Sequence, residues 1–191
     1  FYGFTKLEIE RFLSWYDKLK GIRFAALRYF NAAGYDKEGR IGGLERNPAN
    51  LLPIILEVAA GKRDRIDIFG DDYDTPDGTC VRDYIHVSDL ASGHLAALTY
   101  LVEKDASLTV NLGSESGLSV KEMVEAARRI TGQPIPAVIA GRRPGDPAGL
   151  ESSAQMAKDL MGWEAKYSDL DSLVSTTWEA YLKAFPRSEG R

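Results

Sequence analysis

The sequence predicts an α/β fold that contains some parallel sheet, and two observations support this prediction. Segments with helical spacing of apolar residues alternate with short β-rich segments along all 191 residues, which is the pattern of α/β proteins. The β-rich segments are also few and widely separated, whereas a complete doubly wound dinucleotide-binding sheet needs about six strands. We therefore expect the last part of such a sheet together with a smaller second lobe.

The chain begins with a predicted helix and a predicted strand. Apolar residues three or four apart over 5–19 predict an amphipathic helix that ends at Gly21. The β-rich run 22–30 predicts a buried strand that ends near Asn31. Residues 34–49 are polar and rich in glycine, asparagine and aspartate, so we expect a loop there.

A second helix and a second strand follow this loop. Asn50 stands where a residue would cap a helix over 51–60, and Pro53 lies in the first turn, where a missing N–H costs little. Residues 66–69 alternate between apolar and polar types, as a short strand does. The stretch 70–78 is rich in turn residues.

The second half of the chain repeats this alternation. Residues 81–87 are predicted to be extended, 89–101 helical, and 108–113 a strand with a glycine stop. Ser119 and Glu122 have the spacing of a capping box at the start of a helix that runs to residue 132. The remaining predictions are a strand over 135–140, helices over 153–161 and 170–185, and fraying of the last few residues.

Composition and charge exclude several classes of partner. The 24 basic residues stand against 28 acidic residues, a net charge of −4, so we expect no nucleic acid or anionic membrane as a partner. No apolar run approaches the ~20 residues that a bilayer span needs. Cys80 is the only cysteine, so no intrachain disulfide can form, which fits a reducing compartment. We expect a cytoplasmic protein.

The sequence offers no cluster of metal ligands, and we predict no metal site. His86 and His94 are the only histidines, and neither stands with Cys80 in a ligand motif. We expect both histidines to be packed or hydrogen-bonded structural residues. The acidic stretch 71–78 lacks the residues that a calcium-binding EF-hand loop requires, so we interpret it as a solvated turn.

Tyr2 and Lys6 form a candidate acid/base pair. Residues four apart lie on one face of a helix, and an ammonium group beside a phenol favours the phenolate, which can act as a general base. The same spacing also fits an exposed tyrosine beside a lysine, and Tyr16 and Lys20 share it.

Arg82 and Arg143 are candidate phosphate ligands. A guanidinium group grips phosphate with two parallel hydrogen bonds, and two of them from distant segments would clamp a pyrophosphate. The alternative is a pair of surface salt bridges, for instance Arg82 with its neighbour Asp83. The helix start at Asn50 and Leu51 would attract the same anion, although Asn50 also fits a plain helix cap.

Taken together, these segments resemble the UDP-glucose 4-epimerases, a family of extended short-chain dehydrogenases/reductases. The resemblance extends over nearly the whole chain, and its most specific part runs from residue 69 to 87. It rests on residues 2–6 (YGFTK), 27–34 (LRYFNAAG), 50–53 (NLLP), 68–73 (IFGDDY), 77–87 (DGTCVRDYIHV), 111–113 (NLG) and 142–147 (RRPGDP).

The resemblance implies a fold, a reaction and a cofactor. The fold is the C-terminal part of a Rossmann-type enzyme with its smaller substrate-binding lobe. In this family, bound NAD takes hydride from C4 of the hexose of UDP-glucose or UDP-galactose, the 4-keto sugar turns over, and hydride returns to the other face. The implied partner is a UDP-sugar, and a homodimer is implied through helices that include residues 2–19.

The resemblance also implies roles for named residues. Tyr2 is the acid/base, and Lys6 tunes Tyr2 and holds the nicotinamide ribose of NAD. Phe30 lies at the cofactor end of the site. The substrate-binding residues it implies are Asn31, Asn50 and Leu51 at the phosphates or hexose, Phe69 at the uridine, Arg82 and Arg143 at the pyrophosphate, Asp146 at the uridine ribose, and Leu150 at the hexose pocket.

Leu150 bears on the choice of sugar. In the family, a bulky aromatic residue at this position tends to exclude N-acetylated sugars and a small residue admits them. Leucine is intermediate, so we expect UDP-glucose and UDP-galactose as the main pair, with some activity on UDP-N-acetyl sugars. An epimerase for UDP-xylose/arabinose, N-acetylhexosamine or glucuronate is the enzymatic alternative.

The sequence departs from the family in one respect. Family members carry an N-terminal half with a glycine-rich pyrophosphate loop, whereas this sequence has no G-x-G-x-x-G. We therefore expect a C-terminal fragment that is inactive alone. Within it, residues 1–34 and 81–112 would be the remnant of the NAD-binding domain, and 35–80 and 113–191 the UDP-sugar-binding lobe. A catalytically dead UDP-sugar-binding fragment is the alternative from another class.

Overall fold

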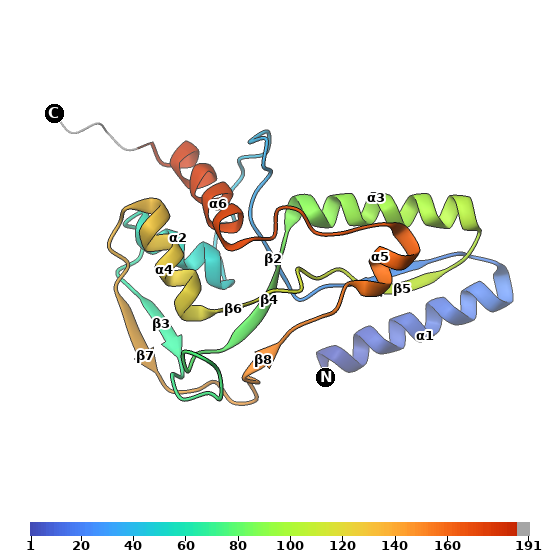
Figure 1. Cartoon of the computed structure of the whole chain (residues 1–191), viewed down its shortest axis with the longest axis horizontal. Helices are drawn as coiled ribbons and strands as arrows, with labels where there is room; N and C mark the ends of the chain where they lie inside the picture. Colours follow the sequence, from blue (N-terminus) through green and yellow to red (C-terminus); the bar gives the residue numbers. More distant parts are fainter. Residues whose placement is uncertain (187–191) are drawn as a thin grey trace.

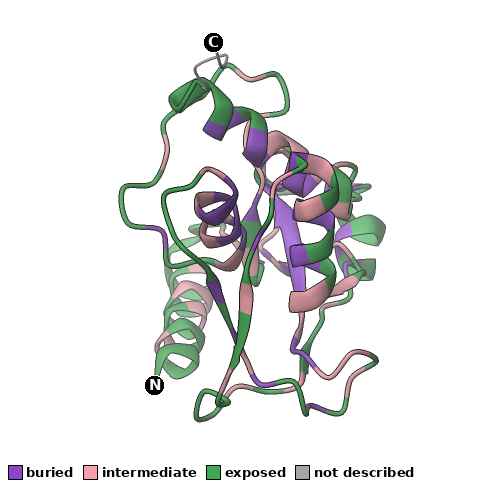
Figure 2. Ribbon diagram, turned by 90° about the vertical axis from the view of Figure 1, so that its left-hand side faces the viewer, coloured by how far each residue is buried: buried purple, intermediate pink, exposed green. Residues whose placement is uncertain are grey.

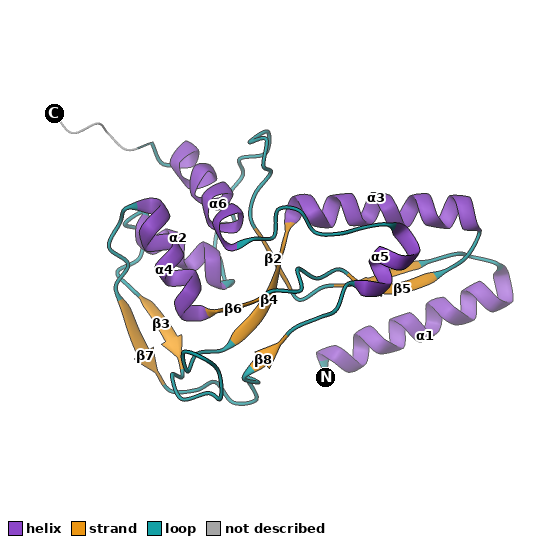
Figure 3. Ribbon diagram, viewed as in Figure 1, coloured by secondary structure: helices purple, strands orange, loops and turns teal. Residues whose placement is uncertain are grey.

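The chain folds as the α/β protein that its sequence predicts. Its computed structural model describes residues 1–186, so the predicted fraying of the last few residues lies outside the described part. Figure 1 shows the elements in chain order and Figure 3 their types: α1 (Tyr2–Lys20), β1 (Ala25–Arg28), β2 (Asn31–Ala33), α2 (Leu51–Ala59), β3 (Ile66–Phe69), β4 (Val81–His86), α3 (Val87–Lys104), β5 (Leu108–Asn111), β6 (Gly117–Ser119), α4 (Val120–Thr131), β7 (Ala137–Ala140), β8 (Gly149–Leu150), α5 (Gln155–Met161) and α6 (Leu170–Ala184).

Strand β4 joins three segments that lie far apart in the sequence. It pairs in parallel with β2 and β8, and antiparallel with β6. The register places Asn31 opposite Tyr84, and Leu150 opposite Arg82. Two further pairs, β1 with β5 and β3 with β7, are parallel. The parallel pairing agrees with the predicted fold class.

Local sequence signals explain where several helices begin and end. Ser119 and Glu122 form the predicted capping box at the start of α4, which satisfies two backbone N–H groups that the helix leaves free. Gly21 ends α1 in the left-handed conformation, with φ 66°. His86 caps α3, because its Nδ1 accepts a hydrogen bond of 3.0 Å from the backbone N–H of Ser88.

The hydrophobic core consists of two clusters. The first lies where α2, α4 and α6 meet, and includes Leu56, Met123 and Leu173. The second lies between α3, β5 and α5, and includes Leu112 and Trp163. Figure 2 shows buried residues concentrated on the inner faces of these packed elements. Each cluster is built from segments that are distant in the chain, so both depend on the tertiary fold.

Helix α1 contributes no buried residue to either cluster, and Figure 2 shows its ribbon as intermediate or exposed. An ion pair connects it to β1, since Arg28 Nε donates to Glu10 Oε1 at 2.7 Å. Its large apolar side chains are exposed, among them Phe4, Phe12 and Trp15. Among the described helices, none is long and apolar enough to cross a membrane.

The strands differ from the prediction where they are very short. The predicted strand over 22–30 is shorter, because β1 ends at Arg28 and the chain then bends into β2, which pairs with a different strand. The predictions also missed β2, β6 and β8. Elements of two or three residues are too short for a period to show, and their pairing partners lie far away in the sequence.

Candidate functional site

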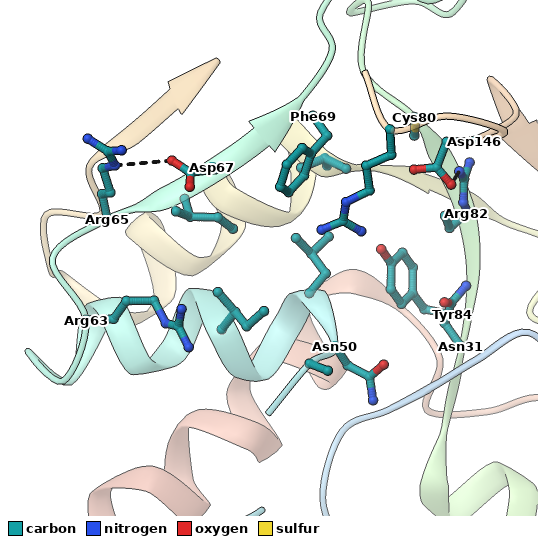
Figure 4. Close-up of a pocket in the computed structure, with 16 residues that line it drawn as sticks. Asn31, Asn50, Arg63, Arg65, Asp67, Phe69, Cys80, Arg82, Tyr84 and Asp146 are labelled. Carbon is teal, nitrogen blue, oxygen red and sulfur yellow. Dashed lines mark hydrogen bonds and ion pairs between the residues drawn. The ribbon is translucent and has the colours of Figure 1, made fainter. Parts of the chain in front are cut away.

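A cavity of about 450 Å³ lies between β3, β4, the start of α2 and the loop that follows β7 (Figure 4). Figure 4 shows Arg65 and Asp67 at one end, Arg82 and Asp146 at the other, and Phe69 between them. Its lining consists of Asn31, Ala49, Asn50, Leu51, Ile54, Arg63, Arg65, Ile66, Asp67, Phe69, Cys80, Arg82, Tyr84, Val120, Arg143 and Asp146.

Strand β4 presents Arg82 and Tyr84 to this cavity, because residues two apart on a strand project to the same face. The Arg82 side chain is only 13% exposed. Its Nη1 donates to the Val81 carbonyl at 2.8 Å, and its Nη2 donates to Asp146 Oδ1 at 3.3 Å. Burial raises the pKa of Tyr84 to about 12, so the Tyr84 phenol stays protonated at neutral pH.

Phe69 and Arg143 form a stack in the middle of the cavity. The guanidinium carbon of Arg143 lies 3.8 Å from the centroid of the Phe69 ring. Within residues 1–186, the guanidinium of Arg143 has no carboxylate partner. Its N–H groups are therefore available to an anion in the cavity.

A tight turn places Arg143 and Asp146 at the cavity. The backbone N–H of Asp146 donates to the Arg143 carbonyl at 3.2 Å, and Pro144 and Gly145 occupy the two central positions. Gly145 has φ 81°. Proline followed by a glycine of positive φ is the signature of a type II turn, so the sequence Arg-Pro-Gly-Asp itself fixes the spacing of the two charged side chains.

The start of α2 forms the floor of the cavity at Asn50 and Leu51. Asn50 occupies the N-cap position as predicted, but its side chain makes no capping hydrogen bond. Asn50 therefore holds the cap position without the capping hydrogen bond. Within residues 1–186, no hydrogen bond occupies its side-chain amide, so the amide can bind a ligand. The first N–H groups of a helix and its dipole attract an anion at this place.

The charges of the lining favour an anion. Four arginines and two aspartates line the cavity, which leaves an excess of two positive charges. Arg65 Nε donates to Asp67 Oδ1 at 3.1 Å, and Arg63 Nη2 donates to Glu57 Oε2 at 2.9 Å. These two arginines already have carboxylate partners, and Arg82 pairs with Asp146. One excess positive charge therefore remains, on Arg143.

A buried carboxylate supports the β4 side of the cavity. Asp83 is 3% exposed, and it accepts hydrogen bonds from the backbone N–H of Ser114 at 3.0 Å and from Ser152 Oγ at 2.7 Å. The backbone carbonyl oxygen of Asp83 accepts a hydrogen bond of 2.9 Å from the side-chain amide of Asn31. The alternative salt bridge between Arg82 and Asp83 is not formed, because Asp83 faces these serines.

Four predicted site residues do not line this cavity. Tyr2 is 73% exposed on α1, and the ammonium of Lys6 lies 5.2 Å from the centroid of the Tyr2 ring. Phe30 immediately precedes Asn31 and is also exposed. Leu150 lies on β8 opposite Arg82, next to the cavity rather than in its lining. The roles assigned to Tyr2, Lys6, Phe30 and Leu150 remain predictions.

Sequence reasoning missed several lining residues. Asp67 alternates with Phe69 on β3, and Tyr84 alternates with Arg82 on β4, so strand periodicity would have found both. Arg63 and Arg65 carry no such signal, because their positions follow from the packing of the α2–β3 turn. Cys80 is a free, buried thiol that lines the cavity, and only the structure places it there.

The histidines have the structural roles that the sequence predicts. His86 is fully buried, and its Nε2 lies 3.0 Å from Thr176 Oγ1. The Nδ1 of His94 lies 2.7 Å from the Leu90 carbonyl oxygen, one turn earlier in α3. In the described part of the chain, no group of three or more histidine, cysteine, aspartate or glutamate side chains is arranged to hold a metal ion.

Comparison with known proteins relates this chain to sugar-nucleotide enzymes. The model of the NAD dependent epimerase/dehydratase family matches residues 1–113. A UDP-glucose 4-epimerase of Halalkalibacterium halodurans is 50% identical over 177 residues, which are 93% of this chain and 53% of that protein.

Two solved structures show the same relation. The UDP-glucose 4-epimerase of Brucella ovis in complex with NAD has a TM-score of 0.90 at 43% identity, covering 94% of this chain and 55% of that one. The enzyme from Bifidobacterium longum in complex with NAD+ and UDP has a TM-score of 0.86 at 38% identity, covering 97% of this chain and 55% of that one. The chain thus spans about half the length of the relatives that it matches.

Proposed function

The chain belongs to the NAD dependent epimerase/dehydratase family, and from this premise we propose that its cavity binds the diphosphate of a UDP-sugar. The proposed activity is that of a UDP-glucose 4-epimerase, which interconverts UDP-glucose and UDP-galactose. The resemblance to enzymes of that description over nearly the whole chain supports this choice.

One observation carries the proposal. The guanidinium of Arg143 lies on the ring of Phe69 without a carboxylate partner among the described residues, in a cavity whose lining has more arginines than aspartates. The two phosphates of a nucleotide sugar carry one negative charge each. Arg143 and Arg82 would donate hydrogen bonds to the phosphates from two sides of the cavity, and the N–H groups at the start of α2 would donate to them as well.

The remaining lining residues suit the rest of the ligand. Phe69 would pack against the uracil ring, and the carboxylate of Asp146 would accept hydrogen bonds from the ribose hydroxyls. Asn31, whose amide is held by the Asp83 carbonyl, would lie at the hexose end together with Asn50. Firm contacts to UDP and few contacts to the hexose suit a reaction in which the keto sugar must turn over.

The residues of this chain fit NAD at its reactive end. Tyr2 and Lys6 lie side by side on an exposed face of α1, and with the exposed ring of Phe30 they would hold the nicotinamide and its ribose. The sequence has no G-x-G-x-x-G turn for the cofactor pyrophosphate. When bound, NAD supplies the acceptor and later the donor of the hydride at C4 of the hexose.

Tyr2 would handle the proton of this reaction. Its phenolate oxygen would take the proton of the 4-hydroxyl as the C4–H bond breaks, and would return that proton when hydride is restored to the other face. The Lys6 ammonium would favour the phenolate by charge. Because Tyr2 lies outside the lining of the cavity, we assign it to the hexose end of a site that extends beyond this cavity.

The two hydrophobic clusters support a division into two parts. Residues 1–34 and 81–112 would form the part that contacts NAD, and 35–80 and 113–191 the UDP-sugar lobe. The cluster of α2, α4 and α6 lies mostly in the second part, and Ala33 and Tyr84 of the first part complete it. Helix α5 packs with β5 and α3 of the first part, so we propose that it bridges the two. A homodimer through α1 and a cytoplasmic location complete the proposal.

Titration of the chain with UDP and with uridine tests the phosphate grip. We expect UDP to bind more than about tenfold tighter than uridine, and we expect its affinity to fall as salt is added, because charge pairs near the surface are screened. Equal affinity for UDP and uridine would contradict the proposal. Product analysis of the full-length enzyme with a panel of UDP-sugars would then test the sugar preference at Leu150.

A second candidate function is UDP-sugar binding without redox chemistry. It is favoured by one observation: the cavity is built entirely from this chain, whereas Tyr2 lies outside its lining. The same titration with NAD present distinguishes the two functions. UDP binding that does not respond to NAD would favour the binding fragment, and a response to NAD would favour the epimerase.

A further inference from the structure

Arg82 and Asp146 form a replaceable ion pair inside the cavity. One hydrogen bond of 3.3 Å joins them, which is longer than the ~2.7–2.9 Å of a strong charge-assisted bond, and it uses one of the five N–H groups of the guanidinium. Arg82 is 13% exposed and Asp146 is 35% exposed. An anion can therefore reach Arg82 only by taking the place of this carboxylate or by sharing the guanidinium with it.

The turn that carries Asp146 holds its carboxylate where a bound anion would lie. Its backbone hydrogen bond from Asp146 to Arg143 keeps Asp146 on the same turn as Arg143, and both residues line the cavity, whether or not Arg82 is paired with the carboxylate. An anion held by Arg82 and Arg143 consequently lies beside a negative charge. That charge is unfavourable unless the anion also brings hydrogen-bond donors to the carboxylate.

We propose that Asp146 makes the cavity bind nucleoside diphosphates in preference to bare pyrophosphate and phosphate. This proposal rests on the proposed function. Asp146 is the counter-ion of Arg82 until the ligand arrives. The phosphates of a nucleoside diphosphate displace the carboxylate from Arg82, and its ribose hydroxyls donate hydrogen bonds to the released carboxylate. Pyrophosphate displaces the carboxylate from Arg82 but has no pair of adjacent hydroxyl groups for Asp146, so the repulsion remains.

This selection has a physiological use that follows from charge alone. Inorganic phosphate and pyrophosphate are anions at neutral pH, so two free guanidinium groups would bind them although they carry no nucleoside. A fixed carboxylate lowers the affinity for every anion, and only a ligand with adjacent hydroxyl groups recovers the loss. Specificity thus comes from a repulsive element as well as an attractive one.

Calorimetric titration of the chain with pyrophosphate and with UDP tests this role. Asp146→Asn removes the charge and keeps the shape, and the turn is held by a backbone N–H that remains. We expect this variant to bind pyrophosphate about tenfold tighter than the unsubstituted chain, equivalent to ~1.4 kcal/mol. The gain for UDP should be smaller or reversed, because the amide accepts the ribose hydroxyls less strongly.

Asp67→Asn is the matched control, because Asp67 lines the same cavity at the other end and pairs with Arg65. It removes an equal charge, and we expect it to change the affinity for pyrophosphate less than about threefold. An equal gain in both variants, or no gain in Asp146→Asn, would overturn the proposal. Asp146→Ala should shift pyrophosphate affinity in the same direction as Asp146→Asn, and thermal unfolding would verify that each variant is folded.

The outcome is separable from that of the proposed function. If the unsubstituted chain fails to bind UDP, the proposed function fails, and the pyrophosphate titrations still decide whether Asp146 opposes anions at Arg82. If UDP binds and pyrophosphate affinity is the same in all four proteins, the proposed function stands and the selective role of Asp146 is wrong.

Discussion

Arg143 differs from the other arginines of the cavity in what holds its guanidinium. Arg63, Arg65 and Arg82 each donate to a carboxylate, whereas Arg143 lies on the face of Phe69. A cation–π contact at a partly exposed site contributes roughly 0.5–1 kcal/mol, and a hydrogen bond between charged groups contributes about 1.5–3 kcal/mol. Phosphate binding therefore outweighs the contact with the ring.

His86 gives the fold a dependence on pH. It is fully buried, and burial lowers its pKa from the ordinary 6.5, against the opposing charges of Asp89 and Asp169. The unfolded chain therefore binds a proton at His86 more readily than the folded chain does. The free energy of unfolding is highest above pH 6.5 with respect to this group, and it falls as the pH is lowered below 6.5. One such group changes that free energy by at most ~1.4 kcal/mol per pH unit.

Urea unfolding of the chain at pH 7.0 and at pH 5.5 measures this effect, and we expect lower stability at pH 5.5. His94→Gln, which removes the exposed histidine, should keep the difference between the two pH values. His86→Gln should be less stable at both and should show a smaller difference. A difference that survives intact in His86→Gln would assign the pH dependence to other groups.

At the scale of elements, the turn from Arg143 to Asp146 connects fold and ligand. Gly145 has φ 81°, and a Cβ added there would meet no atom within 4 Å, so Gly145→Ala is strained by backbone conformation alone. A side chain in the left-handed region costs roughly 1–2 kcal/mol. We expect several-fold weaker UDP binding and a lower unfolding temperature, measured by calorimetry and thermal unfolding.

Gly141→Ala is the matched control for that turn. A Cβ added at Gly141 would also meet no atom within 4 Å, but the φ of Gly141 is not in the left-handed region. This substitution should leave UDP affinity and stability nearly unchanged. Equal effects of the two substitutions would show that the conformation of Gly145 does not position Arg143 and Asp146.

The elements that carry strong local signals could be predicted from sequence, and the others could not. Strand β3 has the predicted bounds because four residues alternate cleanly, and α4 starts at its predicted capping box. Strands β2, β6 and β8 exist only through their pairing with β4, and no pattern of two or three residues reports a distant partner. Tertiary contacts decide such elements.

The same distinction applies to the cavity. Phe69, Arg82, Arg143 and Asp146 could be singled out because their segments resemble a known family, and the structure brings all four to one cavity. The pairing of Arg82 with Asp146 rather than Asp83 could not be predicted, because it depends on where two loops meet. Asn50 likewise shows its free amide only in three dimensions.

At the scale of the whole molecule, α1 presents a large apolar surface. Phe4 and Phe12 are 61% and 64% exposed, and exposed apolar patches of this kind mark sites of association. We expect the chain to self-associate at micromolar concentration in sedimentation velocity experiments. The double substitution Phe4→Asp and Phe12→Asp should shift it toward the monomer, because it places charges on the apolar face.

Val102→Asp is the control for this prediction. Val102 is 75% exposed on α3, so the substitution adds the same kind of charge to another exposed apolar position. It should leave the association unchanged. A chain that is monomeric at every concentration, or one that responds equally to substitution on α1 and α3, would rule out α1 as the specific interface.

The comparison of Arg143→Ala with Arg142→Ala tests the central claim most directly. Arg142 is the adjacent arginine, lies outside the lining of the cavity and pairs with Asp72. In calorimetric titrations with UDP, Arg143→Ala should lose at least about tenfold in affinity, equivalent to ~1.4 kcal/mol, and Arg142→Ala should lose less than about twofold. Unchanged UDP affinity in Arg143→Ala, or equal losses in both variants, would contradict the assignment of this cavity to the phosphates of a nucleotide sugar.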